Sequence, residues 1–389
     1  GQASHTAVTV TVGVGGGASA SGPVTVKVYD PHTRAEVAQA TGPPGHAIEV
    51  HVPSPKLWSP SSPTLYDMRV LCGEDEVLSY FGLRTFTLED GRHGKQPHLN
   101  GKYTFLTGFL DQSWWPDGQY TAPSDEALKF DLDATKMFGF NMVRLHEKVK
   151  KSERWYYNED SLGWAVFQDM PQKYGGASTD LQPVFYAELE AMINGRGNHP
   201  CIVQWTAFNE KDCWTAFPGP AFGDVIHRIR ALDPDRLVDS DSGGWANNFH
   251  LGDCNDVHTY PSPGDVDPSK TQYAMVGEFG GLGVFVSGRE WAPGRCFAYR
   301  HVSHSSGQVA EFSTMCRSLQ SRGDRVSASV YTQTTDVELE CDGFLTFDRI
   351  NKFTPAETAS IRQANEATIH ASNPDLMHHS VWKGHRSAA

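Results

Sequence analysis

The sequence predicts two units in series: a small antiparallel β-sandwich over residues 1–90, followed by a (β/α)8 barrel over residues 91–389. Three observations lead to this fold class. Apolar residues alternate with period two in the first unit, whereas apolar strands alternate with helical patterns in the second. The second unit also offers eight strand candidates, which is the number that closes a (β/α)8 barrel.

Composition restricts the classes of partner. The 389 residues include 33 basic and 46 acidic side chains, a formal net charge of −13, without a dense Lys/Arg block. We therefore expect neither nucleic acid nor a membrane as a partner. No apolar run approaches the ~18 residues of a membrane span. The seven cysteines form an odd set without a CxxC pair, which indicates neither a disulfide framework nor a metal site, and we expect no cofactor.

The first unit consists of alternating apolar runs that begin at Val8, Val24, Ile48 and Tyr66. Clusters of Gly, Pro and Ser separate these runs, as expected for the turns of an antiparallel sandwich. No set of residues in this segment suggests a catalytic or binding site. We interpret it as a support domain.

The second unit has strands expected at 104–110, 141–145, 163–168, 201–208, 236–240, 256–260, 273–277 and 326–332. Apolar stripes at helical spacing around Leu189, Ile229 and Phe312 predict helices between strands. The segment 354–357 (TPAE) is typical of a capping box that opens a last helix. After the fifth to seventh strands the helical patterns are weak and Gly-, Asn- and Pro-rich loops replace them. We expect the pocket on the face that carries these long loops.

Polar side chains follow the expected strands at their carboxyl ends, where barrels of this kind place their chemistry. Because so many hydrogen-bonding groups meet at one rim, we expect a polyol substrate, and hence a carbohydrate. The set comprises Asp111, Gln112, His146, Asp169, Asn209, Glu210, Asp241, His258, Tyr260, Glu278, Tyr331, Gln333, Asp336 and Glu338.

Two glutamates stand out within this set. Glu210 and Glu278 follow the fourth and seventh strands, which lie on opposite sides of a barrel mouth. Cleavage of a glycosidic bond commonly needs two carboxylates that face each other across a pocket, one to protonate the departing oxygen and one to stabilise or attack the oxocarbenium-like carbon. A lone Glu is ordinarily a solvated or ion-paired surface residue. Here the paired strand-end positions and the flanking aromatic residues Trp205, Phe208 and Phe279 favour a catalytic role.

A series of motifs occurs in order between about residue 20 and about residue 370. They are 57–60 (LWSP), 81–85 (FGLRT), 139–146 (GFNMVRLH), 197–200 (GNHP), 209–210 (NE), 256–261 (DVHTYP), 277–281 (GEFGG) and 330–338 (VYTQTTDVE). Together they resemble glycoside hydrolase family 2, which includes β-galactosidases, β-mannosidases and β-glucuronidases.

This resemblance implies an immunoglobulin-like sandwich ahead of a catalytic barrel. It also implies a retaining, exo-type β-glycosidase that forms a covalent glycosyl-enzyme intermediate. Glu210 matches the family's acid/base and Glu278 its nucleophile, while Asn209 matches the residue that binds the sugar 2-hydroxyl. The expected substrate-binding set is Asn209, His146, His258, Tyr260, Trp291 and Asp111, with Tyr260 also donating to the nucleophile.

Two other functions stay open. The family usually carries a sugar-binding domain ahead of the sandwich, and no such domain precedes the first β-runs. The chain is therefore also compatible with a barrel that kept its rim residues but serves as a binding or assembly component, alone or as an oligomer. A metal-dependent hydrolase could use His146, His258 and a rim Asp, but strand one lacks the His-x-His that such sites commonly need. Neither motif nor composition identifies the sugar.

Overall fold

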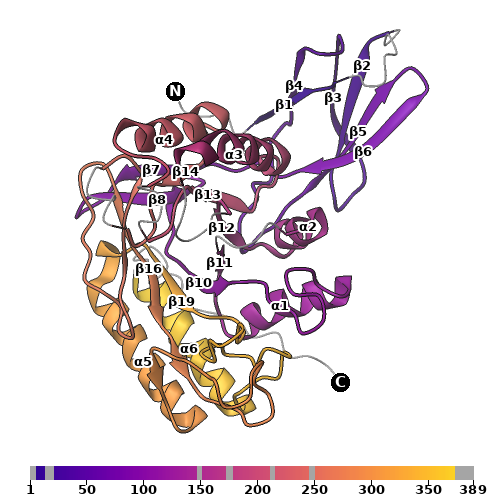
Figure 1. Cartoon of the computed structure of the whole chain (residues 1–389). Coiled ribbons are helices and arrows are strands. Elements are labelled where there is room, and N and C mark those ends of the chain that lie inside the picture. Colours follow the sequence, from indigo (N-terminus) through magenta and orange to yellow (C-terminus); the bar gives the residue numbers. More distant parts are fainter. Residues whose placement is uncertain are drawn as a thin grey trace, which may run out of the picture.

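The computed structural model of the chain describes residues 6–13, 22–146, 151–171, 178–210, 215–244 and 250–372. A β-rich unit projects from one end of a larger barrel (Figure 1). The barrel contains eight parallel strands, so the predicted fold class, a sandwich followed by a (β/α)8 barrel, is confirmed.

The sandwich is built from two antiparallel sheets, β1–β4 and β3–β2–β5–β6. On β2, Val24, Val26 and Val28 are buried while the residues between them are not, because successive side chains of a strand point to opposite faces. The strands are β1 (Ala7–Thr11), β2 (Val24–Tyr29), β3 (Glu36–Gly42), β4 (Ala47–His51), β5 (Tyr66–Cys72) and β6 (Asp75–Phe81).

A small antiparallel sheet connects the sandwich to the barrel. It contains β7 (Phe86–Asp90), β8 (Lys95–Leu99) and β9 (Lys102–Tyr103). The backbone N–H of Lys95 donates to the carbonyl of Ser269 at 2.9 Å, and the Tyr103 hydroxyl donates to the carbonyl of Val326 at 3.3 Å. Because β7 pairs with β8, this sheet spans the expected boundary, and the division of the chain at residues 90 and 91 stays a prediction.

The barrel strands follow the order β14-β13-β12-β11-β10-β19-β16-β15, all parallel. The two terminal strands of this order, β14 and β15, are in contact, so the ring nearly closes. The strands are β10 (Leu106–Asp111), β11 (Met142–Leu145), β12 (Ala165–Asp169), β13 (Ile202–Thr206), β14 (Leu237–Asp239), β15 (Cys254–His258), β16 (Tyr273–Gly280) and β19 (Ala328–Thr332). Each overlaps one predicted strand.

Helices cover the outside of the barrel (Figure 1). Leu189 on α3, Ile229 on α4 and Phe312 on α5 are buried, as the apolar stripes predict. Thr354 and Glu357 form the expected capping box, with the Thr354 N–H donating to the Glu357 carboxylate at 2.9 Å. The helices are α1 (Asp125–Met137), α2 (Glu153–Leu162), α3 (Gln182–Arg196), α4 (Pro220–Leu232), α5 (Ser305–Arg322) and α6 (Pro355–Ser372).

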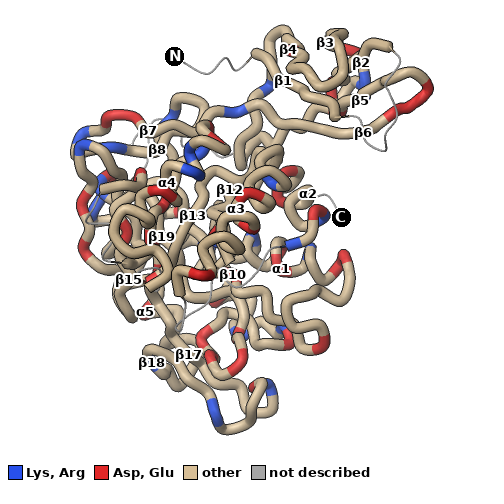
Figure 2. The backbone as a smooth tube through the Cα atoms, turned by 45° about the horizontal axis from the view of Figure 1, so that its top comes forward, with Lys and Arg blue, Asp and Glu red and all other residues tan. Residues whose placement is uncertain are grey.

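The described residues that connect β14 to β15 and β15 to β16 form loops instead of helices, as the sequence predicts. After β16, by contrast, a long loop is followed by the helix α5. None of the described helices combines the length and the apolar character that a membrane span requires. Acidic and basic positions are distributed over both the sandwich and the barrel (Figure 2).

One disulfide is present within the described residues, between Cys296 and Cys341. The expectation that the cysteines indicate no disulfide framework is therefore wrong for this pair. The two cysteines are 45 residues apart in sequence, but the fold brings their Cα atoms to 5.4 Å. This bond fastens the long loop between β16 and α5 to the turn that follows β19. Its pairing depends on tertiary proximity, which the spacing of the cysteines does not reveal.

Buried polar contacts fix the sandwich to the amino-terminal end of the barrel. The fully buried Asp160 carboxylate accepts hydrogen bonds from the Tyr80 hydroxyl at 2.9 Å and from the Cys201 N–H at 2.8 Å. Arg84 donates to the carbonyl of Pro200 at 2.9 Å. We call this region the Asp160 junction.

Candidate active site

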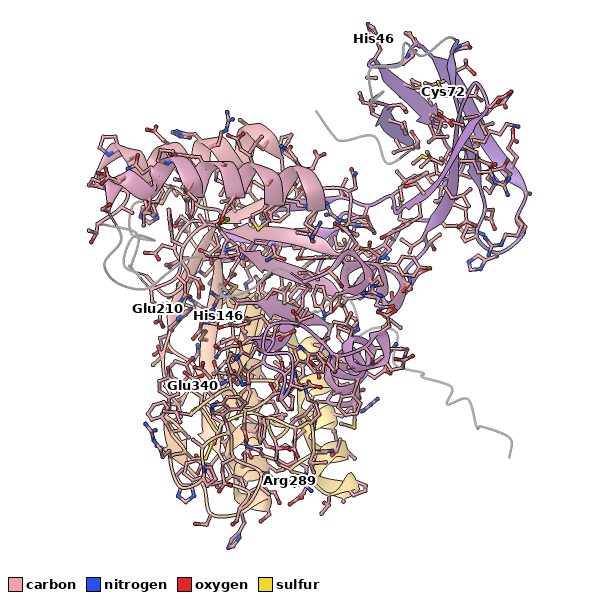
Figure 3. All side chains as sticks on the ribbon, turned by 45° about the vertical axis from the view of Figure 1, so that its right-hand side comes forward. His46, Cys72, His146, Glu210, Arg289 and Glu340 are labelled. Carbon is pink, nitrogen blue, oxygen red and sulfur yellow. A yellow bond between two sulfur atoms is a disulfide. The ribbon has the colours of Figure 1, made fainter. Side chains whose placement is uncertain are left out.

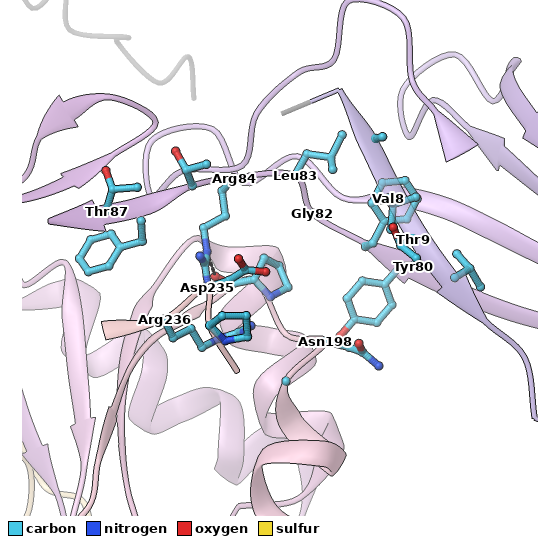
Figure 4. A pocket seen from close by; sticks show the side chains of 18 of the residues that line it. Val8, Thr9, Tyr80, Gly82, Leu83, Arg84, Thr87, Asn198, Asp235 and Arg236 are labelled. Atoms are coloured by element: carbon cyan, nitrogen blue, oxygen red, sulfur yellow. Dashed lines mark hydrogen bonds between the residues drawn. The ribbon is translucent and has the colours of Figure 1, made fainter. Parts of the chain in front are cut away.

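A large cleft lies beside the Asp160 junction. It has a volume of about 1040 Å³ and separates β1 and the segment after β6 from residues 197–200 and 234–237 of the barrel (Figure 4). These barrel segments precede β13 and β14, so the cleft is at the amino-terminal end of the barrel. Arg84 and Arg236 both donate to the carbonyl of Ile202. Arg84 follows the sandwich and so links the two units, whereas Arg236 makes this contact within the barrel. The carboxylates that line the cleft are Glu89 and Asp235.

A smaller pocket, of about 180 Å³, opens at the carboxyl end of the barrel strands. His146, Glu210 and Glu340 lie in this region, far from the outer edge of the sandwich that carries His46 (Figure 3). The pocket is lined by Leu110, Gln112, His146, Glu210, Tyr260, Glu278, Tyr299, Thr332 and Glu340. Most of this lining consists of residues at the strand ends that the sequence marks as candidates.

Glu278 reaches the pocket from β16 at a local irregularity of the barrel. The pairing register shifts between Val257 and His258 on β15 and between Val276 and Phe279 along β16. Such bulges turn side chains toward a site. Gly277 allows the close packing because a Cβ atom there would lie 2.1 Å from a carboxylate oxygen of Asp256.

The Glu278 carboxylate is buried and surrounded by donors. Arg144 donates to one oxygen at 3.1 Å, and the Tyr260 hydroxyl donates to the other at 2.5 Å. His258 Nδ1 and His146 Nε2 lie 3.6 and 3.8 Å from the carboxylate. Burial raises the pKa of Glu278 above its ordinary value, while His258, Arg144 and the Tyr260 hydrogen bond oppose this shift because they stabilise the anion.

Glu210 lies directly after β13 and is more exposed than its partner. Its side chain is 43% accessible, whereas that of Glu278 is 6% accessible. Its backbone adopts a positive φ of 52°, a conformation that few residues other than Gly adopt. One carboxylate oxygen of Glu210 lies within 4.8 Å of an oxygen of Glu278. The structure thus brings the two predicted carboxylates together.

His258 links Glu210 to a chain of hydrogen bonds. Ser242 donates its single hydroxyl proton to Asp256 at 2.5 Å, so its oxygen accepts from His258 Nε2 at 3.0 Å. The other ring nitrogen, Nδ1, lies 2.8 Å from Glu210. Burial alone would lower the pKa of His258, but Glu278, Glu210 and Asp256 outweigh it and raise the pKa above its ordinary value. The ring is therefore suited to share a proton with Glu210.

Arg144 is the central cation of the site, and the sequence predicts no role for it beyond a motif position. Fully buried on β11, it pairs with Asp169 at 2.8 Å and donates to the side-chain oxygen of Asn209 at 2.8 Å and to Glu278. A signal was available: an arginine inside a four-residue strand that is otherwise apolar must have a buried anionic partner.

Of the expected substrate-binding residues, only His146 and Tyr260 line the pocket. Asn209 and His258 lie behind the lining, where they contact Arg144 and Glu210, and Asp111 and Trp291 make other contacts. The Asp111 carboxylate is 3.0 Å from Lys151 and accepts from the Ser113 N–H at 2.7 Å. Trp291 is 40% exposed and packs edge-on against Trp114, with ring centroids 5.4 Å apart.

Three other rim candidates also point elsewhere. Tyr331 is fully buried against Phe344 in the apolar layer outside the barrel, with ring centroids 4.7 Å apart. Asp336 pairs with Lys352 at 2.7 Å. Glu338 is exposed.

Tyr299 and Glu340 line the pocket but were not predicted from the sequence. Tyr299 precedes β18 (Arg300–His301) and stacks on Tyr260, with ring centroids 3.5 Å apart and planes within 5°. Both residues belong to loops without a periodic pattern, so no signal in the sequence could have placed them.

Glu210, His258 and Glu278 are also the described residues whose ligand atoms are close enough to hold a metal ion. These atoms already form hydrogen bonds with one another and with neighbouring residues. His258 Nδ1 bonds to Glu210, and the Glu278 oxygens bond to Arg144 and Tyr260. An ion would have to replace these contacts.

Fold and site together define a class of protein. A parallel eight-stranded barrel with two carboxylates set close together at its carboxyl end is the arrangement of barrel glycoside hydrolases. Residues 2–84 match the family model for glycosyl hydrolases family 2, and residues 93–267 match the model for the TIM barrel domain of the same family. The chain belongs to glycoside hydrolase family 2, and the resemblance found in the sequence is confirmed.

Curated relatives of this chain are much longer proteins. A putative β-glucuronidase from Formosa agariphila is 30% identical over 216 residues, which are 51% of this chain and 19% of the relative. A β-galactosidase from Staphylococcus xylosus is 23% identical over 265 residues, 63% of this chain and 25% of the relative. The chain thus spans about a fifth to a quarter of the length of these relatives.

Solved structures share the fold. A β-D-glucuronidase from Dictyoglomus thermophilum superposes with a TM-score of 0.71 at 19% identity, covering 88% of this chain and 64% of that chain. The Lactobacillus rhamnosus β-glucuronidase gives a TM-score of 0.72 at 20% identity, covering 94% and 66%. The arrangement of sandwich and barrel therefore recurs in both of these enzymes.

Proposed function

We propose that this chain forms the catalytic part of a retaining, exo-type β-glycosidase. The observation that carries this proposal is the distance of at most 4.8 Å between one oxygen of Glu210 and one of Glu278. Retaining glycosidases hold their carboxyl groups about 5–5.5 Å apart, whereas inverting enzymes need about 6.5–9.5 Å to admit a water molecule. The spacing supports direct attack by one carboxylate.

The two glutamates would act in two steps. In the first, Glu278 bonds to the anomeric carbon, the glycosidic C–O bond breaks, and the departing oxygen takes the proton of Glu210. In the second, water attacks the same carbon, Glu210 takes a proton from that water, and the bond to Glu278 breaks. The exposure of Glu210 supports its contact with both the leaving group and water, and the burial of Glu278 supports attack on a single bound sugar.

Neighbouring residues support these roles. His258 Nδ1 is placed to share the proton of Glu210, and Tyr260 and Arg144 stabilise the Glu278 anion. Asn209, held by Arg144, is assigned to the sugar 2-hydroxyl, and His146 to the wall of the subsite. The pocket volume of about 180 Å³ is below the ~300–1,000 Å³ of drug-sized ligand sites. It suits one terminal sugar ring, which supports exo action on a carbohydrate.

A mechanism-based reagent tests the proposal. The chain is incubated with 2,4-dinitrophenyl 2-deoxy-2-fluoro-β-glycosides of galactose, glucose, mannose and glucuronic acid, then digested for mass spectrometry. We expect one reagent to add a single fluorosugar to the peptide that contains Glu278. Failure of every reagent, together with no hydrolysis of aryl β-glycosides, would contradict the proposal and favour a binding or assembly role. NMR of the first-formed product should show the β anomer, and an α anomer would contradict retention.

A further inference from the structure

Glu340 brings a third carboxylate into the pocket, and the two-step mechanism does not use it. Its turn, which follows β19, is fixed by reciprocal backbone hydrogen bonds of 2.9 Å between Glu340 and Val337. The next residue, Cys341, is bonded to Cys296. The Glu340 side chain is therefore presented by a rigid segment.

One carboxylate oxygen of Glu340 is held by two amides. Gln112 Nε2 and Gln333 Nε2 each donate to Oε2 at 2.9 Å. The second hydrogen of Gln112 goes to the Gln333 side-chain oxygen at 2.8 Å, and that of Gln333 goes to Asp342 at 2.7 Å. Since each NH₂ group has only two hydrogens, the amides have no donor left for a ligand. The other oxygen, Oε1, has no hydrogen-bond partner among the described residues and remains an acceptor for a sugar hydroxyl.

The charge around this acceptor is negative. Glu210, Glu278 and Glu340 all line the pocket, and no Lys or Arg of the described ranges does. Arg144, the central cation of the site, is fully buried and already pairs with Asp169 and Glu278. A negatively charged sugar would therefore meet Glu340 without a Lys or Arg of the described residues beside it in the pocket.

We infer that the pocket takes a neutral β-hexopyranoside, with Glu340 accepting a sugar hydroxyl and excluding uronides by its charge. This inference rests on the proposed glycosidase function and specifies its substrate class. It separates this chain from the β-glucuronidases whose fold it shares. A site that must bury like charges together discriminates strongly, so we expect kcat/KM for a β-glucuronide to lie about a hundredfold or more below that for the best neutral glycoside.

The substrate class is tested on the unmodified chain. kcat/KM is measured with the 4-nitrophenyl β-glycosides of galactose, glucose, mannose and glucuronic acid. A glucuronide that is hydrolysed best, or within tenfold of the best neutral sugar, overturns the inference and leaves the proposed β-glycosidase function intact. If no glycoside is hydrolysed and no fluorosugar labels Glu278, the proposed function fails and this inference fails with it.

The role of Glu340 is tested by Glu340→Gln, which removes the charge and keeps the size. We expect kcat/KM for the best neutral glycoside to fall about tenfold or more, and the ratio of glucuronide to neutral activity to rise about tenfold or more. Glu366→Gln, on the exposed face of α6, removes the same charge and should leave both values unchanged. An unchanged ratio in folded Glu340→Gln would overturn the role of Glu340. The wild-type panel decides the substrate class even if this variant does not fold.

Discussion

The two ends of the barrel use buried polar groups for opposite purposes. At the amino-terminal end, Asp160 and Arg84 are matched to hydroxyl, amide and carbonyl partners that tie the sandwich to the barrel. At the carboxyl end, Glu210, Glu278 and Glu340 crowd one small pocket, where burial raises the pKa of Glu278. The first arrangement satisfies its polar groups, and the second maintains like charges close together. We therefore expect the amino-terminal end to serve stability and the carboxyl end to serve chemistry, as in barrel enzymes generally.

Replacing the candidate nucleophile should have the largest effect. Glu278→Gln removes the group that we propose bonds to the anomeric carbon, so we expect kcat/KM to fall about 10⁴-fold or more on every aryl β-glycoside. The thermal unfolding midpoint should not fall, because the substitution removes a buried charge that lies near other carboxylates. Normal turnover by this variant would exclude Glu278 as the nucleophile.

Replacing the candidate acid should have an effect that depends on the leaving group. Glu210→Gln should lower the hydrolysis of a phenyl β-glycoside about 10²–10⁴-fold, because phenolate needs a proton to depart. A 2,4-dinitrophenyl β-glycoside needs little acid help and should keep most of its rate of glycosyl-enzyme formation, measured as a burst of phenolate. Equal losses in this burst for both substrates would argue against the acid role of Glu210.

A change at the opposite end should affect stability and leave catalysis intact. Asp160→Ala removes the buried carboxylate that accepts hydrogen bonds from the Tyr80 hydroxyl and the Cys201 N–H. The free energy of unfolding, measured with urea, should therefore fall by about 3–5 kcal/mol. The kcat/KM of the folded protein should stay within about threefold of wild type. The matched control is Asp90→Ala, whose side chain is 91% exposed, and its effect should be about 0–1 kcal/mol. If Asp160→Ala lowered kcat/KM strongly while the free energy of unfolding stayed unchanged, the assignment of stability to one end of the barrel and of catalysis to the other would be wrong.

The smallest expected effect is a shift in pH dependence. In the proposed mechanism Glu278 must be ionised to attack, so activity should be lost as the pH falls through its pKa, which burial raises. The Tyr260 hydroxyl donates to the carboxylate and lowers this pKa, so Tyr260→Phe should raise it. The acidic limb of the pH profile of kcat/KM should therefore move to higher pH. A limb that stays in place or moves to lower pH would show that Tyr260 does not stabilise the Glu278 anion.

Strand periodicity made much of the site predictable. Glu210, His258 and Glu278 could be placed at one rim because parallel strands bring their carboxyl ends together. The same rule placed Asp111 and Tyr331 there too, although Asp111 pairs with Lys151 and Tyr331 packs into the apolar layer. A strand pattern locates the end of a strand, but side-chain direction near that end also depends on bulges and neighbours.

By itself, the sequence determined the sandwich, the eight barrel strands and the pair of glutamates, since each depends on a local pattern of apolar and polar residues. Only the tertiary structure decided that Cys296 pairs with Cys341, that Tyr299 stacks on Tyr260, and that Glu340 faces the pocket. The physical reason is the same in each case. Loops satisfy their backbone and side chains through distant partners, so contacts made across the folded chain, and not a repeating pattern, fix their side chains.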